Sequence, residues 1–163
     1  MNEGIIQIYC GDGHGKSAAA LGQAIHAASL GKNVIIIKFL KSQEDSEFMT
    51  RLEPEIKVFR FEKSEVNFEE LSESEKQEEV QNIRNGLNFA KKVLTTGGCD
   101  MLILDEVLGL LDNHIIEADE LRAILEAKTE EETIILTGIQ LHDETCIVAD
   151  EIYKIEPMNF RVF

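Results

Sequence analysis

The chain has 163 residues and a net charge of −15, from 31 acidic and 16 basic side chains. That length predicts a single domain over residues 1–163. With 44% hydrophobic residues, 11 Gly and 2 Pro, the composition excludes a disordered or fibrous protein. The acidic excess argues against a nucleic-acid partner, because such surfaces rely on Lys and Arg to displace counterions.

Cysteine usage and apolar runs indicate the cellular setting. Cys10, Cys99 and Cys146 are odd in number and widely spaced, which favours buried thiols over a disulfide framework or a metal site. The longest apolar runs, such as residues 34–37 and 101–104, fall far short of the roughly 18 residues that a membrane span needs. We therefore expect a cytoplasmic protein without a membrane partner.

The first third of the chain predicts a βαβ unit. Residues 5–9 are a short β-rich run that leads into a glycine cluster, and residues 17–30 are alanine-rich. That segment predicts a helix with Leu21 and Ile25 on one face, and its alanines would let the helix lie close against a sheet. Residues 34–40 are apolar except for Lys38, as expected for a strand covered on both sides.

The middle of the chain predicts one exposed strand and one long helix. Residues 42–55 are polar and mixed, and residues 56–61 alternate like a half-exposed strand. Residues 62–79 hold eight Glu and two Lys, which favours a solvated loop and a helix start. Residues 80–94 carry apolar side chains at spacings of three and four, which predicts a helix that ends near Gly97.

The last third continues the alternation. Residues 101–104 and 133–136 predict buried strands, and a helix is predicted between them from near Glu117. Residues 142–150 predict a short helix and residues 151–155 a last strand. Strands that alternate with helices predict an α/β fold with a mainly parallel sheet and helices on both faces.

A glycine-rich segment lies between the first strand and the first helix. It consists of Cys10, Gly11, Asp12, Gly13, His14, Gly15, Lys16 and Ser17. Alternating glycines let successive N–H groups converge on phosphate oxygens at the helix start. Lys16 adds a positive charge and Ser17 a hydroxyl for Mg²⁺, so the segment resembles a P-loop in a P-loop NTPase-like (RecA-like) fold. Cys10 stands where the strict pattern has glycine, and a glycine turn without a ligand is the alternative.

Two carboxylates follow the buried strand at residues 101–104. Asp105 and Glu106 are thereby expected at the carboxyl edge of the sheet, where open α/β sheets bind ligands. Asp105 matches a Walker B aspartate that orders Mg²⁺, and Glu106 is a candidate second metal-shell or base group. The alternative is that both residues only cap the next helix.

These motifs together resemble the ATP:corrinoid adenosyltransferases of cobalamin salvage. Residues 11–17 look like that family's G-N-G-K-G-K-T loop, which also lacks the leading glycine. Residues 38–42 resemble its Q-F-x-K-G segment, residues 100–106 its D-x-x-x-L-D-E strand, and residues 137–139 its T-G-R segment. The similarity extends from about residue 5 to about residue 156.

The resemblance implies transfer of the 5′-deoxyadenosyl group of ATP to the Co(I) of a corrinoid, with release of triphosphate. ATP and a corrinoid would be the substrates, with Mg²⁺ as cofactor, and family members are often homodimers. By the resemblance, Lys16 and Glu106 act in catalysis, and Ser17 and Asp105 hold the metal. The nucleotide would be bound by Gly11, Asp12, Gly13, His14, Gly15, Lys16, Ser17 and Lys41.

Four departures from the family pattern keep other functions open. His14 occupies the position of a lysine in the family loop, and Ile139 occupies the position of the T-G-R arginine. Lys38 replaces the glutamine of Q-F-x-K-G, which is a smaller change. The first strand begins by residue 5, where the family has an N-terminal segment, and there is no Trp, so that Phe59, Phe61 and Phe68 are either substitutes or core residues. An ATP-binding regulatory homologue and a P-loop kinase or NTPase are the alternatives.

Overall fold

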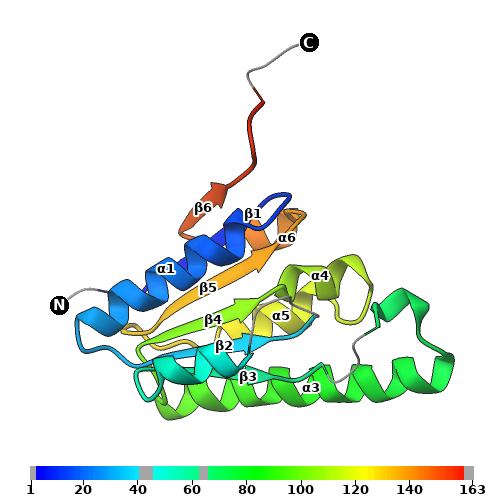
Figure 1. Cartoon of the computed structure of the whole chain (residues 1–163), viewed down its shortest axis with the longest axis horizontal. Helices are drawn as coiled ribbons and strands as arrows, with labels where there is room; N and C mark the ends of the chain where they lie inside the picture. Colours follow the sequence, from blue (N-terminus) through cyan, green and yellow to red (C-terminus); the bar gives the residue numbers. More distant parts are fainter. Residues whose placement is uncertain (1–2, 41–45, 63–65, 160–163) are drawn as a thin grey trace.

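A six-stranded parallel sheet forms the centre of the molecule (Figure 1). The computed structural model describes residues 3–40, 46–62 and 66–159. In these ranges the strands are β1 (Ile6–Cys10), β2 (Val34–Lys38), β3 (Ile56–Arg60), β4 (Met101–Asp105), β5 (Thr133–Gly138) and β6 (Glu151–Lys154). Their order is β3-β2-β4-β5-β1-β6, and every neighbouring pair is parallel. The predicted mainly parallel sheet is confirmed.

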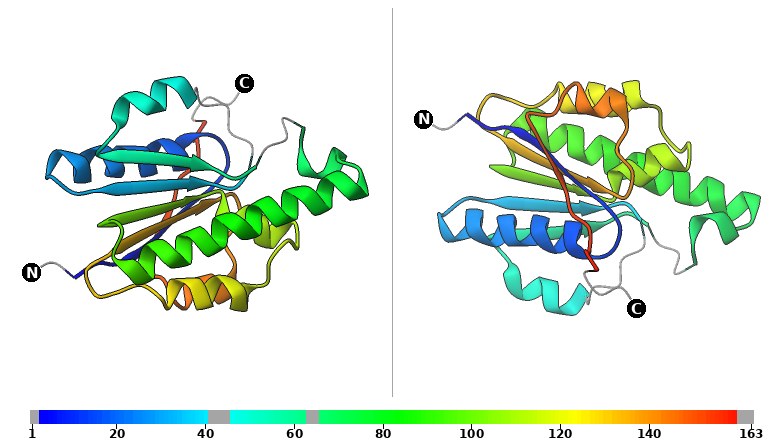
Figure 2. Two further views of the ribbon diagram at one scale, coloured as in Figure 1. Left: turned by 90° about the horizontal axis from the view of Figure 1, so that it is seen from below. Right: turned by 90° about the horizontal axis from the view of Figure 1, so that it is seen from above.

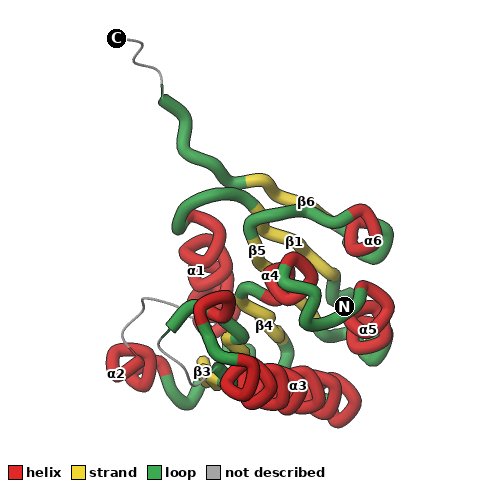
Figure 3. Tube along the Cα trace, turned by 90° about the vertical axis from the view of Figure 1, so that its right-hand side faces the viewer, coloured by secondary structure: helices red, strands yellow, loops and turns green. Residues whose placement is uncertain are grey.

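Helices cover both faces of this sheet, as the sequence predicts (Figures 2 and 3). They are α1 (Gly15–Ser29), α2 (Ser46–Met49), α3 (Glu73–Thr96), α4 (Val107–Asp112), α5 (Ala118–Leu125) and α6 (Asp143–Cys146), with 3₁₀ turns at Thr50–Leu52 and Phe68–Glu70. Two separate apolar clusters fill the two faces, one under α1 and one under α3, α4 and α5. Among the described residues, no helix is both long and apolar enough to cross a membrane.

Small side chains bring α1 close to the sheet. Ala20, Ala24 and Ala27 are buried on its inner face, where they pack against strand residues such as Ile36. The prediction that alanines let this helix lie close to the sheet is confirmed, and Ile25, at 50% exposure, lies outside the packed face. The alanines recur at spacings of four and three and leave Ile25 one residue off that stripe.

The opposite face of the sheet is packed by larger side chains. Helix α3 begins with a capping box, in which Ser72 Oγ accepts from the Glu75 N–H and Glu75 Oε2 accepts from the Ser72 N–H. It ends at Gly97 in a left-handed conformation, as the sequence predicts. Ile83 and Leu94 on its inner face are fully buried against the strands.

The sequence pattern did not predict two of the helices, and it predicted a third that is longer than the helix in the structure. Helix α4 has only six residues, and residues 107–111 are all buried, so no polar face marks it as a helix. Helix α2 lies within residues 42–55, a polar and mixed segment whose pattern predicts no helix. The predicted helix over residues 142–150 is limited to α6 at Asp143–Cys146.

Candidate functional site

The glycine-rich loop joins β1 to α1 at the carboxyl edge of the sheet. Gly11 and Gly13 have φ angles of +135° and +84°, which side-chain-bearing residues rarely adopt. At Gly11 a Cβ atom would collide with the carbonyl oxygen of Ile155, and at Gly15 it would come within 2.8 Å of the Ile155 side chain. The loop is therefore packed from outside by the chain that follows β6.

Cys10 occupies a strand position and not a turn. It is the last residue of β1, its side chain is buried, and its carbonyl accepts from the Ile155 N–H at 2.8 Å. Burial raises the pKa of the Cys10 thiol above its ordinary value. The backbone here is extended and paired, so the position does not need the glycine of the strict loop pattern.

The structure brings the two predicted catalytic side chains together. Lys16 Nζ lies 3.1 Å from Glu106 Oε1 and donates a hydrogen bond to the Gly13 carbonyl at 3.0 Å. Lys16 is buried, whereas Glu106 is partly exposed. Glu106 has a left-handed backbone with φ of 60° at the start of α4, an uncommon conformation for a residue with a side chain. This backbone turn aims its carboxylate back toward the loop.

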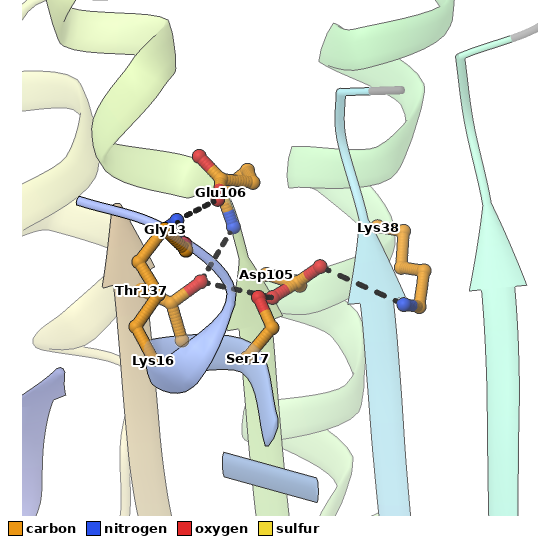
Figure 4. A network of polar contacts seen from close by, with 7 residues as sticks. All are labelled: Gly13, Lys16, Ser17, Lys38, Asp105, Glu106 and Thr137. Carbon is orange, nitrogen blue, oxygen red and sulfur yellow. Dashed lines mark hydrogen bonds and ion pairs between the residues drawn. The ribbon is translucent and has the colours of Figure 1, made fainter. Parts of the chain in front are cut away.

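Asp105 is held by two hydroxyl groups (Figure 4). Its Oδ1 accepts from Ser17 Oγ at 3.0 Å and from Thr137 Oγ1 at 2.9 Å. Thr137 Oγ1 in turn accepts from the Glu106 N–H at 2.8 Å. The aspartate lies at the end of β4, and its hydroxyl partners Ser17 and Thr137 come from α1 and β5. This network fixes the orientation of a buried carboxylate. The predicted metal pair, Ser17 and Asp105, is thus in direct contact.

The sequence does not assign Thr137 to the site, and it predicts Lys38 at the ligand edge of the sheet as either a site residue or a solvated side chain. Thr137 was noted only in the T-G segment, and β5 runs two residues beyond its predicted end, which brings the Thr137 hydroxyl beside Asp105. Lys38 is buried at the end of β2, and its Nζ lies 3.7 Å from Asp105 Oδ2. The available signal was that both residues lie at the carboxyl ends of strands, Lys38 as the last residue of β2 and Thr137 as the second-last of β5, but their neighbours depend on the strand order.

A cleft of about 840 Å³ opens above this network. One side consists of loop and helix residues that include His14, Lys16 and Ser17, with Asp105 and Glu106 beneath. The other side, here called the far wall, consists of Leu40, Glu62, Asn67, Phe68 and Glu69. The volume of the whole cleft is near the upper end of the usual range for a small-molecule site. The cleft therefore has one side that holds Lys16 and the two strand-end carboxylates, and a far wall that combines the apolar groups of Leu40 and Phe68 with polar side chains.

The other predicted site residues divide into three groups. His14 lines the cleft as the residue before α1, and Asp12 is exposed in the loop. Phe68 lines the cleft, whereas Phe59 and Phe61 pack on Phe89 at centroid distances of 4.8 and 5.9 Å, as core residues do. Lys41 lies outside the described residues, so its predicted contact with the nucleotide stays a prediction.

The oxygen donors around Asp105 suit Mg²⁺. This ion prefers oxygen ligands and is usually held by one or two carboxylates together with substrate phosphates and water. Ser17 Oγ and Asp105 Oδ1 are a hydroxyl and a carboxylate 3.0 Å apart. Within the described ranges no cluster of three or more His, Cys, Asp or Glu side chains could hold a metal ion. The donor set therefore fits a cation shared with phosphate and not a closed protein site.

Fold and site define the class of this protein. The parallel sheet, the glycine-rich loop before α1 and the buried aspartate beside the loop serine are features of the P-loop NTPase-like (RecA-like) α/β fold. Solved structures agree with this fold: the flagellar accessory protein FlaH of Methanocaldococcus jannaschii matches with a TM-score of 0.63 at 17% identity over 99% of this chain and 75% of its own. The KaiC-like protein PH0186 of Pyrococcus horikoshii OT3 matches with a TM-score of 0.59 at 17% identity, over 98% and 76%.

The family is narrower than the fold. The model of the family "ATP:corrinoid adenosyltransferase BtuR/CobO/CobP" matches residues 2–161, and this chain belongs to that family of transferases. The corrinoid adenosyltransferase of Escherichia coli K12 is 26% identical over 96% of this chain and 78% of its own length. Corrinoid adenosyltransferase CobA of Salmonella typhimurium LT2 has the same identity and coverage. The family resemblance seen in the sequence is confirmed.

Proposed function

We propose that this protein transfers the 5′-deoxyadenosyl group of ATP to the Co(I) of a corrinoid. The electron pair of Co(I) attacks the ribose C5′, a Co–C bond forms, and the C5′–O bond breaks. Triphosphate departs with the bonding electron pair, and cobalt becomes formally Co(III). Because the nucleophile is the substrate's own metal, the protein needs no nucleophilic side chain. Family membership and a charged P-loop that faces a large cleft support this proposal.

The P-loop side of the cleft would bind the triphosphate. The N–H groups of the loop converge there at the start of α1, where the helix dipole favours anions. Lys16 would exchange its contact with Glu106 for phosphate oxygens, so that its ammonium stabilises the charge that grows on the leaving group. Before ATP binds, the contact with Glu106 would keep the lysine side chain aimed into the cleft. His14 adds a donor at the loop rim.

Ser17 and Asp105 would hold Mg²⁺ against the phosphates. The bound ion supplies positive charge that neutralises the triphosphate. Thr137 would keep the Asp105 carboxylate in one orientation through its hydrogen bond to Oδ1. This arrangement places the phosphates at the charged side and leaves the far wall for the acceptor.

The far wall would contact the corrinoid. Leu40 and Phe68 offer apolar surface at the side of the cleft opposite the loop. A corrin ring is a large and mostly apolar plane, so burial of this surface would hold it near the ribose and exclude water. Phe68 would thereby serve as a substitute for the aromatic side chains that the family resemblance implies there.

Adenosyl transfer is tested by its products. The protein is mixed with ATP, Mg²⁺ and a corrinoid under strict reduction, and the adenosylcorrinoid spectrum and the released phosphate species are followed. We expect adenosylcorrinoid and triphosphate in equal amounts. If ATP binds but no adenosylcorrinoid forms, adenosyl transfer is wrong.

A regulatory ATP-binding protein or an NTPase is the second candidate. The observation that favours it is Ile139, which lines the cleft at 51% exposure where the family pattern has arginine. One expected phosphate contact is therefore missing. Release of orthophosphate would indicate hydrolysis, and ATP binding without any product would indicate a regulatory role.

We propose further that the chain is a single domain that works in the cytoplasm as a homodimer, without a nucleic-acid partner. Packing of the described residues around one sheet supports the single domain. The four residues of the edge strand β6 are exposed, among them Ile152 and Tyr153, which supports a second copy as partner. The net charge of −15 opposes nucleic acid. A solution mass of twice 18.3 kDa would support the dimer.

A further inference from the structure

Lys38 approaches the buried aspartate from the side away from the P-loop. Lys38 and Asp105 are direct partners in the register of β2 and β4. Lys38 Nζ lies 3.7 Å from Asp105 Oδ2, and the two side chains are 4% and 7% exposed. Figure 4 shows Ser17 and Lys38 on opposite sides of this carboxylate. One oxygen therefore accepts from two hydroxyls, and the other faces an ammonium group.

The ammonium lies beneath the cleft floor and not in the cleft. Among the described residues, those that line the 840 Å³ cleft include Asp105 and Ser17 but not Lys38. Lys38 instead borders a small space of about 10 Å³, together with Ser17 and Asp105. That space is close to the volume that holds one water molecule. Apolar side chains complete its wall, namely Ala20, Leu21, Ile36, Met49 and Ile103.

This position makes the Lys38 charge strongly felt at Asp105. Charges interact more strongly where water is excluded, because the effective dielectric constant is lower than in bulk solvent. The ammonium offsets the negative charge that the carboxylate would otherwise present to a cation in the cleft. A divalent cation beside Asp105 would also be repelled by the same ammonium group.

We propose that Lys38 is a positioning residue that reduces the preference of this site for magnesium-bound ATP over metal-free ATP. The inference rests on the proposed function only in that the cleft takes ATP. Lys38 supplies from beneath a part of the positive charge that Mg²⁺ supplies from the cleft. It also holds Oδ2 of Asp105, so that Oδ1 stays turned toward Ser17 and Thr137.

The test compares two dissociation constants of ATP by calorimetry, one in excess Mg²⁺ and one in EDTA. The ratio of the EDTA value to the Mg²⁺ value measures the preference for magnesium-bound ATP and does not depend on turnover. Lys38→Met keeps the length of the side chain and removes its charge. We expect this variant to raise the ratio on the order of tenfold, the size expected for removal of one nearby charge.

Matched variants identify the cause. Lys38→Arg keeps the charge and is expected to stay within about threefold of the wild-type ratio, a span of well under 1 kcal/mol. Lys32→Met removes an exposed lysine that follows α1 and should leave the ratio unchanged. A melting curve with Mg²⁺ alone gives a second readout, since the Met variant should gain more stability from the ion than the wild type does.

The outcomes separate the inference from the proposed function. If Lys38→Met leaves the ratio within twofold of wild type, or if Lys38→Arg raises it equally, the role of Lys38 is wrong. Lys38→Gln is measured in the same way if the Met variant does not fold. If the wild-type protein binds no ATP in either buffer, the proposed function itself fails.

Discussion

The two sides of the cleft are built in different ways. On the P-loop side, Lys16, Ser17, Asp105 and Glu106 are joined by short polar contacts that fix each side chain before any ligand binds. The far wall instead presents Phe68 and other groups from the segments that follow β2 and β3. In the proposed function, the polar network binds the triphosphate and the apolar groups of the far wall contact the large ring of the acceptor. We therefore expect phosphate recognition and acceptor recognition to be separable by mutation.

Lys16→Ala should have the largest effect, because it removes the central cation of the polar side. The buried ammonium is lost and Glu106 keeps a charge without its 3.1 Å partner. We expect ATP affinity to fall on the order of a hundredfold, the size of a lost hydrogen bond to a charged group with its unpaired neighbour. Calorimetry measures this, with the exposed Lys32→Ala as control. ATP affinity within threefold of wild type would show that the loop does not bind phosphate.

Thr137→Val should loosen the polar side without changing its charge. The substitution keeps the shape of the side chain but removes the donor to Asp105 Oδ1 and the acceptor for the Glu106 N–H. Buried groups that lose their partners cost about 1–3 kcal/mol of unfolding free energy. Urea unfolding should therefore show a loss of about 2 kcal/mol. Thr95→Val, at an exposed position of α3, should stay close to wild type; an equal loss there would contradict the network's importance.

Phe68→Ala tests the far wall alone. Phe68 lines the cleft opposite the P-loop, so we expect corrinoid affinity to fall roughly tenfold, which is about the value of one aromatic contact surface. ATP affinity should not change. Absorbance titration of the corrinoid and calorimetry of ATP measure the two effects. Phe48→Ala, which removes an exposed ring elsewhere, is the control, and a fall in ATP affinity in the Phe68 variant would contradict the division of the cleft.

Glu75→Gln should have the smallest effect, at the helix start that supports the far wall. Hydrogen bonds from Ser72 hold the pKa of the Glu75 carboxyl below its ordinary value of about 4.5. A lowered pKa means that the ionised group contributes stability above pH 4.5 and that this contribution is lost as the pH falls below it. Wild type should melt slightly higher than the variant at pH 7, and the difference should shrink at pH 3. Glu78→Gln on the same exposed surface is the matched control, and an equal difference in melting temperature at pH 7 would contradict a role of the capping box.

The polar side could be predicted from sequence to a large extent. The loop, its Lys16 and Ser17, and the Asp105 that follows a buried strand are each encoded by neighbours in the chain. Local order therefore determines them, and the sheet edge brings them together. The missing glycine at position 10 also has a local cause, since Cys10 ends a paired strand.

The rest depends on which strands are neighbours. Thr137 and Lys38 contact Asp105 because β4 lies between β2 and β5, and a chain with the same local patterns in another order would separate them. The far wall also combines Leu40 with Phe68, which are distant in sequence.

The contact between Ile155 and the glycine-rich loop changes how those glycines are interpreted. Side chains at Gly11 and Gly15 would meet Ile155 before they met any nucleotide. Selection on folding alone would thus retain two glycines of the loop in a descendant that no longer binds ATP. In such a lineage, loss of Lys16 or Ser17 would report the loss of function sooner than loss of the glycines. For the same reason, a protein tag or a truncation near residue 155 would alter the glycine-rich loop, although residue 155 is far from the loop in the sequence.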